Sequence, residues 1–374
     1  MSKTDNELKT DTVVIGSGIV GLACAREIAQ KGDQVVVLEK HGRSGEETSS
    51  RNSGVIHSGI YYPTGSKKAT LCVEGNRLLY EYVKNRNIAY RNTGKIIVAS
   101  TVDEVEKLER LFRKGLDNNV KHLSILSKRE VIKYQPEIIA EQGLYCPSSG
   151  IVDVSELIQS LEAELQELGV IIAYNSIVED IHIDSCSGFK LMVRGQENYS
   201  INAQKVVNSA GLHAVDLATK IKEIPREIIP KAYYAKGHYF QLGGNHPFTD
   251  KLIYPLNEKD GLGIHVTLDI SGKVRFGPDV TWIEEIDYSF DEDLRESFVE
   301  VIKTYWPNLN PEKLTPDYTG IRPKIYGPND EPADFLIQTS KEHKISGLVN
   351  LLGIESPGLT SSFAMAREVV KNLF

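Results

Sequence analysis

Six residues near the amino terminus, GSGIVG at 16–21, have the spacing of a turn that binds phosphate groups. Gly16 would permit the tight turn, Gly18 would let backbone N–H groups approach a pyrophosphate, and Gly21 would let a helix pack closely on a strand. With Ile19 and Val20 between them, these glycines are predicted to bind the pyrophosphate of a dinucleotide.

The residues around this turn give it the context that the motif requires. A β-branched run at 12–15 precedes it, a helical pattern at 22–31 follows it, and a second apolar run at 35–38 ends at Glu39. This order predicts a βαβ unit with a parallel sheet and a right-handed crossover. Glu39 would accept hydrogen bonds from an adenosine ribose, and an acid there disfavours a 2′-phosphate. Lys40 is assigned to the same cofactor site.

The segment ETSSRNSGVIHSGIYY at 47–62 distinguishes a flavin from a nicotinamide cofactor. A nicotinamide dehydrogenase usually continues from the acid into another βα unit, whereas this chain continues into small hydroxyl residues and one cation. Such residues could contact a second part of the cofactor, along its phosphates and ribityl chain. The alternative is a serine-rich surface loop. The predicted contacts are Thr48, Ser49, Ser50, Arg51, Asn52 and Ser53.

At these residues the sequence resembles the FAD-dependent family that contains D-amino-acid oxidases, sarcosine oxidases, glycerol-3-phosphate dehydrogenases and 2-hydroxyglutarate dehydrogenases. The segment from SSRNSG to LLYEYV, 49–83, is similar to the L-2-hydroxyglutarate dehydrogenase branch. Further similar segments are GKIIVAS at 94–100, LGIHVT at 262–267, FGPD at 276–279 and TGIRP at 319–323. The chain departs from that branch at AYYAKGHYF, 232–240, and at GIESPGLTSS, 353–362. The resemblance therefore implies FAD as cofactor more specifically than it implies a substrate.

The resemblance implies further contacts with FAD. The loop at 353–362 would lead into a helix over 362–373, whose start Pro357 and Gly358 would delay. Backbone N–H groups and the positive helix end would then face the flavin pyrimidine ring and stabilise the reduced flavin. The residues assigned to this contact are Gly358, Leu359 and Thr360, and an ordinary N-cap at Thr360 or Ser361 is compatible with it. Val178 would contact adenine, although it reads equally well as a core valine, and Ala210 and Gly211 would form a turn passing the cofactor.

Oxidation of a 2-hydroxy acid by a flavin needs a base for the hydroxyl proton and a cation for the carboxylate. His57 and His265 are the predicted bases, because imidazole titrates near neutral pH, and the sequence favours neither. Each also reads as a hydrogen-bonded structural histidine. Arg322 is the predicted carboxylate anchor, since its planar fork can bind a carboxylate through two hydrogen bonds; the alternative is a surface salt bridge. Residues that could reach a small anionic substrate are Tyr62, Tyr254, Lys236 and Lys324.

The elements that would position these residues follow from hydrophobic periodicity. Helices are predicted over 68–84, 102–118, 155–168 and 289–305, and strands over 96–99, 171–174, 177–183 and 189–193, the last three in a second sheet. Runs between 231 and 278 predict an antiparallel sheet. The fold class is therefore α/β, a glutathione-reductase-like FAD-binding domain with an inserted antiparallel-sheet substrate domain. The FAD-binding domain would comprise 1–85, 145–225 and 325–374, and the substrate domain 86–144 and 226–324.

Composition limits the classes of partner. The chain has 374 residues, 41% of them hydrophobic, and a net charge of −8, which argues against nucleic acid as a partner. Its four cysteines, Cys24, Cys72, Cys146 and Cys186, are widely spaced, which favours neither a disulfide framework nor a metal site. No apolar run is long enough for a transmembrane helix, and MSKTDNELKT resembles neither a secretory nor a mitochondrial signal. We expect a cytoplasmic protein, with peripheral membrane contact left open.

The main prediction is an FAD-dependent dehydrogenase or oxidase of a small 2-hydroxy acid resembling L-2-hydroxyglutarate. The alternatives are an amine or amino-acid oxidase of the same family, a flavin-binding subunit without catalysis of its own, and a plain NAD dehydrogenase. The sequence leaves the electron acceptor open among oxygen, a quinone and a protein.

Overall fold

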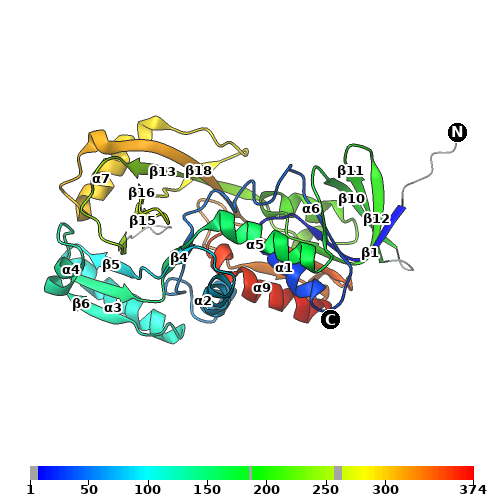
Figure 1. The fold of residues 1–374 in the computed structure, drawn as a ribbon, viewed down its shortest axis with the longest axis horizontal. Helices are drawn as coiled ribbons and strands as arrows, with labels where there is room; N and C mark the ends of the chain where they lie inside the picture. The colour runs from blue at the N-terminus through cyan, green and yellow to red at the C-terminus, as the bar shows by residue number, and fades with distance from the viewer. Residues whose placement is uncertain (1–6, 185–187, 257–262) are drawn as a thin grey trace. The chain divides into compact units, whose positions relative to one another are not determined.

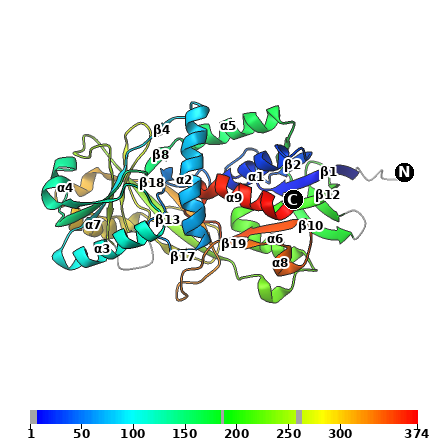
Figure 2. The same ribbon diagram turned by 90° about the horizontal axis from the view of Figure 1, so that it is seen from below.

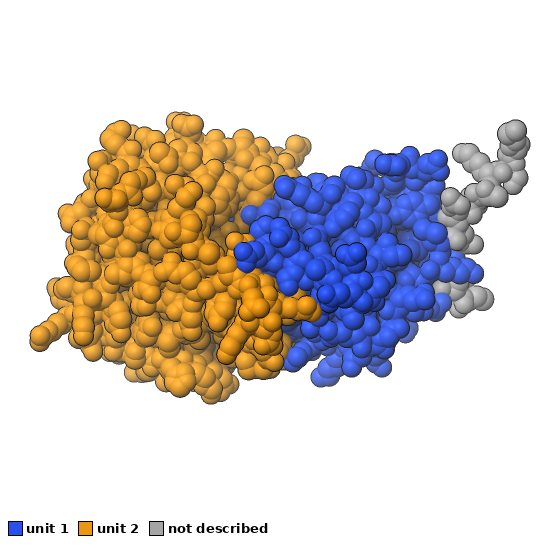
Figure 3. Space-filling model, viewed as in Figure 1, with its two compact units in different colours: residues 1–50, 155–234, 322–374 blue, residues 51–154, 235–321 orange. Residues whose placement is uncertain are grey.

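A computed structural model describes residues 7–184, 188–256 and 263–374, so Cys186 and Leu262 lie outside the described residues. The chain divides into two compact units (Figure 3). Unit 1 comprises residues 1–50, 155–234 and 322–374, and unit 2 comprises residues 51–154 and 235–321. No helix in the described parts of the chain is both long and apolar enough to cross a bilayer.

The core of unit 1 is a sheet whose central strands are parallel (Figure 1). Adjacent strands, in order, are β20 (Leu348–Leu352), β12 (Tyr199–Asn208), β1 (Glu7–Ile15), β2 (Val35–Leu38) and β9 (Ile171–Ala173). On one edge, β19 (Leu336–Gln338) pairs antiparallel with β20. The runs of β-branched residues in β1 and β2 suit strands that are buried on both faces.

Helices cover both faces of this sheet (Figure 2). Helix α1 (Ile19–Ala29) packs against α9 (Gly358–Leu373), and Arg26 of α1 forms an ion pair with Glu164 of α5 (Val154–Glu167). Helix α6 (Ala214–Lys220) contributes Leu217 to the core cluster that includes Val13 of β1. The short helix α8 (Ser340–His343) precedes β20.

Two local predictions for unit 1 are wrong. The runs at 171–174, 177–183 and 189–193 do not form a second sheet: β9 pairs with β2, and β10 (Ile177–Asp184) and β11 (Gly188–Arg194) extend the amino-terminal half of β12. The last helix begins at Gly358 and not at 362. Pro357 is tolerated because it occupies the N-cap position, where no N–H is needed inside the helix.

Unit 2 contains the predicted antiparallel sheet. The strands run in the order β17 (Thr281–Ile283), β13 (Tyr233–Leu242), β16 (Val274–Phe276), β15 (Val266–Leu268), β14 (Leu252–Pro255), β5 (Lys95–Ala99), β7 (Gln142–Cys146) and β6 (Ser124–Ser127). Strand β18 (Leu314–Lys324) pairs with β13, and β14 is parallel to β5. The helices of this unit are α2 (Lys67–Asn85), α3 (Val102–Asp117), α4 (Lys128–Tyr134) and α7 (Arg295–Tyr305).

The start of α7 corrects the predicted helix over 289–305. A short 3₁₀ turn at Glu292–Leu294 precedes the helix, and the side chain of Asp291 accepts a hydrogen bond from the backbone N–H of Asp293. This local bond stabilises a turn and so delays the helix to Arg295.

The compact units differ from the predicted domains mainly at 51–85 and 145–154, which lie in unit 2. A three-stranded sheet explains this, because β8 (Gly150–Val152) pairs with both β3 (Val55–Ile56) and β4 (Tyr90–Arg91). The amide of Asn118, at the end of α3, also donates to the carbonyl oxygens of Gly59 and Tyr62. These bonds join the segment to its neighbours in unit 2.

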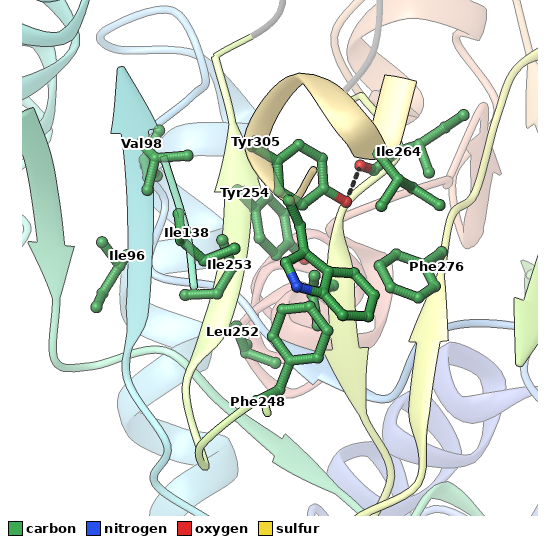
Figure 4. Packing of buried hydrophobic residues seen from close by; sticks show 14 of the residues in the cluster. Ile96, Val98, Ile138, Phe248, Leu252, Ile253, Tyr254, Ile264, Phe276 and Tyr305 are labelled. Carbon is green, nitrogen blue, oxygen red and sulfur yellow. Dashed lines mark hydrogen bonds between the residues drawn. The ribbon is translucent and has the colours of Figure 1, made fainter. Parts of the chain in front are cut away.

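One face of the large sheet in unit 2 is an apolar core (Figure 4). Ile253 pairs with Val266, which pairs with Phe276, and their side chains pack with Phe248 and Tyr305. The phenol of Tyr305 donates a hydrogen bond to the carbonyl oxygen of Ile264 at 3.0 Å (Figure 4). Because successive side chains on a strand alternate between faces, the neighbouring residues of the same strands point to the opposite face.

Candidate active site

The glycine turn of unit 1 leaves no room for side chains. Gly16 has φ +97°, and a Cβ there would lie 2.7 Å from the carbonyl oxygen of Ser209. A Cβ at Gly21 would lie 1.9 Å from the carbonyl oxygen of Gly16. Helix α1 therefore begins directly against the turn, and the N–H groups of its first residues, Ile19 and Val20, lie at its positive end.

Ser49 connects the predicted flavin segment to this turn. Its hydroxyl oxygen accepts a hydrogen bond from the N–H of Ile19 at 3.0 Å, and a Cβ at Gly18 would lie 3.0 Å from the same oxygen. Thr48 and Ser50 flank it, and the N–H of Ser50 donates to the carbonyl oxygen of Gly45. A hydroxyl beside the first turn of α1 suits a pyrophosphate, which accepts hydrogen bonds from both kinds of donor.

Glu39 is buried at the end of β2. One carboxylate oxygen accepts hydrogen bonds from the N–H and hydroxyl of Ser17, each at 2.8 Å, and the other accepts from the N–H of His41 at 2.9 Å. A carboxylate offers about four lone-pair positions, so a ribose hydroxyl can still be accommodated. Val178 is close along the chain to Ser176, whose N–H donates to the carbonyl oxygen of Glu39 at 2.7 Å. The side chain of Val178 packs in the core of unit 1.

Lys40 is held by an acid from the flavin segment. Its Nζ lies 2.8 Å from Oε1 of Glu47 and 2.5 Å from Nε2 of His213. Burial raises the pKa of the Glu47 carboxyl, but hydrogen bonds from His213 and Lys40 outweigh it and lower that pKa to about 2. The three side chains thus join β2, the segment at 47–50 and the turn after β12.

This cluster gives a pH-dependent prediction. Because the pKa of Glu47 is lowered on folding, its contribution to stability is present above the ordinary carboxyl pKa and is lost as the pH falls through about 2. Glu47→Gln should therefore lower the free energy of unfolding at pH 7, and the difference from the wild type should shrink between about pH 4.5 and pH 2. Urea unfolding followed by circular dichroism across this range measures it. If the difference in free energy of unfolding between wild type and Glu47→Gln stays constant with pH, the pKa of Glu47 is not lowered by folding.

The remaining predicted cofactor residues of unit 1 lie at the carboxyl ends of β12 and β20. Ala210 and Gly211 follow β12, and a Cβ at Gly16 would lie 3.2 Å from Cα of Ala210. After β20, the first turn of α9 contains Gly358, Leu359 and Thr360, and the N–H of Gly358 donates to the carbonyl oxygen of Glu355. The buried hydroxyl of Ser361 makes no hydrogen bond to the described residues.

These features fit a bound dinucleotide. The turns after β1, β2, β12 and β20 lie at the carboxyl ends of neighbouring parallel strands, which is where open α/β sheets bind ligands. At the N-termini of α1 and α9 the N-cap residues, Gly18 and Pro357, make no side-chain cap bond, so first-turn N–H groups can serve as donors to a ligand. These N–H donors suit a ligand that carries acceptors such as phosphate groups and ring carbonyls.

In unit 2, the predicted residues His57, His265 and Tyr254 lie close together at the edge of the apolar core, to which Tyr254 belongs. The rings of Tyr254 and His265 stack with centroids 3.8 Å apart and an interplanar angle of 19°. Nδ1 of His265 lies 2.9 Å from the carbonyl oxygen of Gly263, which can only accept a hydrogen bond. Nδ1 therefore carries the proton in the neutral ring, and Nε2 carries the lone pair that a base needs.

His57 lies near His265. Its carbonyl oxygen accepts a hydrogen bond from the amide of Asn76 on α2 at 2.8 Å, so the backbone is fixed. Burial, then the charge of Lys95, then that of His265 hold the pKa of His57 well below its usual range. His57 is therefore neutral at physiological pH.

The other predicted flavin and substrate residues of unit 2 have defined contacts. Arg51 donates to the carbonyl oxygen of Thr319, and its guanidinium carbon lies 4.4 Å from the ring centroid of Tyr288. Asn52 accepts a hydrogen bond from the N–H of Gly54, and the hydroxyl of Ser53 lies 2.9 Å from that of Tyr239.

The predicted lysines are engaged within the protein. Lys236 forms a hydrogen-bonded ion pair with Asp287 at 2.7 Å in unit 2. Lys324 forms one with Glu355 at 2.7 Å in unit 1, where both side chains are buried. Arg322 lies in β18 and is partly buried. The carbonyl oxygen of Tyr62 accepts a hydrogen bond from the side-chain amide of Asn118 at 2.9 Å.

Sequence reasoning missed two members of this cluster, Tyr239 and Lys95, whereas the Tyr61 and Tyr62 pair was expected near the reactive ring. Tyr61 stacks on Tyr254 with centroids 6.4 Å apart, Tyr239 contacts Ser53, and Lys95 lies under the ring of Tyr254. Lys95 belongs to GKIIVAS, so a signal was present in a strand that is otherwise apolar. His238 is not part of the cluster. It lies edge-on to Phe290, which also contacts Phe240, and it is bonded to Asp279.

Comparison with known proteins agrees with this geometry. A family model described as FAD dependent oxidoreductase, DAO, matches residues 11–372. The chain is 39% identical to "L-2-hydroxyglutarate dehydrogenase, mitochondrial" from Arabidopsis thaliana, over 96% of this chain and 83% of that protein. It is 29% identical to "Glycerol 3-phosphate dehydrogenase" from Caloramator mitchellensis, over 96% of this chain and 73% of that protein.

Among solved structures, the fold is similar to that of L-alpha-glycerophosphate oxidase from Mycoplasma pneumoniae with FAD bound. The TM-score is 0.87 at 26% identity, and the match covers 98% of this chain and 94% of that one. The predicted fold class, an FAD-binding domain with a substrate domain, and the predicted cofactor, FAD, are confirmed. With the family match spanning almost the whole chain, the conclusion is direct: this protein belongs to the DAO family of FAD-dependent oxidoreductases.

Proposed function

We propose that this enzyme oxidises L-2-hydroxyglutarate, or a small 2-hydroxy acid close to it, to the corresponding 2-oxo acid. The observation that carries the proposal is the fixed tautomer of His265, because alcohol oxidation needs a base for the hydroxyl proton. Relatives with the name L-2-hydroxyglutarate dehydrogenase, at up to 39% identity, support this substrate class.

The residues then have distinct roles. When bound, FAD would supply the acceptor for a hydride from the substrate carbon that carries the hydroxyl group. Nε2 of His265 takes the hydroxyl proton, while His57 stays neutral and so does not oppose the charge that develops on His265. Arg322 binds the carboxylate through its planar guanidinium. Tyr62 and Tyr254 complete the proposed substrate contacts, whereas Lys236 stays bonded to Asp287 and Lys324 to Glu355 in the loop before α9.

A substrate panel tests this proposal. Turnover would be measured with a dye as electron acceptor and L-2-hydroxyglutarate, D-2-hydroxyglutarate, glycerol 3-phosphate or glycine as substrate. We expect kcat/KM for the L-hydroxy acid to exceed that of every other compound by about 100-fold or more, because the site must bind a carboxylate and orient one hydrogen. If glycine alone is turned over, the enzyme is an amine oxidase. If glycerol 3-phosphate alone is turned over, it is the substrate in place of the proposed hydroxy acid.

The electron acceptor and the location belong to the same proposal. Repeating the assay with oxygen, a soluble quinone or a carrier protein in place of the dye would identify the acceptor. Fractionation would test the expected cytoplasmic location and any peripheral contact with a membrane, since several relatives are named as mitochondrial proteins.

A further inference from the structure

Lys95 is a buried cation without a counter-ion. It lies in β5 and is 0% exposed, and its Nζ has neither a hydrogen-bond partner nor an ion pair among the described residues. An isolated buried ammonium is strongly unfavourable, because it loses its hydration and gains no anion in return. A stable core would place an apolar residue here, as it does at the neighbouring positions Ile96, Ile97 and Val98.

The contacts of Lys95 are aromatic. Its Nζ lies 3.8 Å from the ring centroid of Tyr254 and 5.3 Å from that of Tyr61. On β14, Tyr254 pairs with Ile97, two residues from Lys95, so both side chains are on one face of the sheet. The Tyr254 ring stacks in turn on His265 at 3.8 Å. Ammonium, phenol ring and imidazole form a continuous stack.

We infer that Lys95 is a positioning residue for the base: it holds the Tyr254 ring against His265 and so orients the imidazole that takes the substrate's proton. The inference rests on the proposed function, because it assigns His265 as the base. A cation is attracted to the face of an aromatic ring, and the attraction is stronger when both are shielded from water, so it favours one ring orientation. The phenol of Tyr254 makes no hydrogen bond to the described residues that could fix it instead.

The charge of Lys95 is not neutralised by the groups that face it. They are the thiols of Cys72 on α2 and Cys146 on β7, the phenols of Tyr61 and Tyr254, and the imidazoles of His57 and His265. Burial raises the pKa of the Cys146 thiol to about 12 and that of Cys72 further, so both thiols are neutral. Burial lowers the pKa of Lys95 itself to about 8, which leaves it mostly protonated at pH 7. Its charge then helps to keep His57 neutral.

Two variants test the inference. Lys95→Met removes the charge and keeps most of the volume, and Lys251→Met is the matched control, because Lys251 is in the same unit and pairs with Asp250. We expect Lys95→Met to lower kcat about 10-fold with less than about a 3-fold change in KM. Lys251→Met should match the wild type.

Histidine titration by NMR gives a readout that does not need turnover. In the wild-type protein with FAD bound, His57 should stay neutral to well below its ordinary pKa, and in Lys95→Met its pKa should rise by about one unit. Unchanged kcat and unchanged histidine titration in a folded Lys95→Met protein would overturn the inference. If that variant does not fold, titration of wild-type His57 at an ordinary pKa would overturn it alone. A wild type that fails to oxidise any hydroxy acid would refute the proposed function, whereas the titration tests only the charge of Lys95.

Discussion

His265→Asn should lower the rate constant for reduction of the bound flavin by about 1,000-fold. The base contributes about 10²- to 10⁴-fold to proton transfer, and asparagine has no group that accepts a proton at neutral pH. Its amide can still donate to the carbonyl oxygen of Gly263, so the local fold should be retained. Stopped-flow absorbance of the flavin under anaerobic conditions measures the rate constant.

Two further variants make the His265 experiment decisive. His57→Asn should reduce the rate less, because His57 is neutral and supports the base without being it. His182→Asn, at an exposed position on β10, should have no effect. If His57→Asn lost the full 1,000-fold and His265→Asn stayed near the wild type, the roles of the two histidines would be exchanged. A rate that neither substitution changes would point to a substrate without a hydroxyl proton, such as an amine.

Gly21→Ala should give a protein that purifies without flavin. A Cβ at this position would lie 1.9 Å from the carbonyl oxygen of Gly16, far inside the distance that real Cβ atoms keep from backbone. Helix α1 would have to move away from the turn, and its N–H donors would leave the pyrophosphate position. The ratio of flavin absorbance to protein absorbance gives the flavin content of the purified protein. We expect the substitution to weaken FAD binding by more than about 100-fold.

Gly42→Ala is the matched control for this substitution. Gly42 is also in unit 1, just after β2, and a Cβ there would meet only the side-chain oxygen of Asn175, at 3.8 Å. The control should bind FAD like the wild type. Full flavin content in Gly21→Ala would contradict the placement of the pyrophosphate at this turn, whereas loss in both variants would indicate a general sensitivity of the region.

The parts of this molecule that could be predicted are those set by short-range constraints. At the turn 16–21, the positive φ of Gly16 and the clash of a Gly21 Cβ with the carbonyl oxygen of Gly16 are local constraints. The helix predicted over 68–84 corresponds to α2, Lys67–Asn85, because Ser66 caps it and apolar residues recur at helical spacing. His57, His265 and Tyr254 were found because a resemblance drew attention to their segments.

The parts that could not be predicted depend on long-range pairing. Whether 171–174 joins the first sheet depends on β2, which lies far away in the sequence, and no local pattern encodes that partner. Lys95 was missed because a lone lysine in a strand ordinarily lies at the solvent edge, and its burial becomes apparent only when β14 and β7 flank it. In the same way, only the packing distinguishes Tyr61 from Tyr62 as the ring that stacks on Tyr254.

The central claim is that this chain transfers a hydride from a 2-hydroxy acid to its bound FAD. The most direct measurement adds L-2-hydroxyglutarate to the purified yellow protein without oxygen, then records the flavin spectrum and assays the product. We predict that the flavin band bleaches and that one equivalent of the 2-oxo acid forms per flavin. A protein whose flavin is reduced by dithionite but by no hydroxy acid would contradict the account.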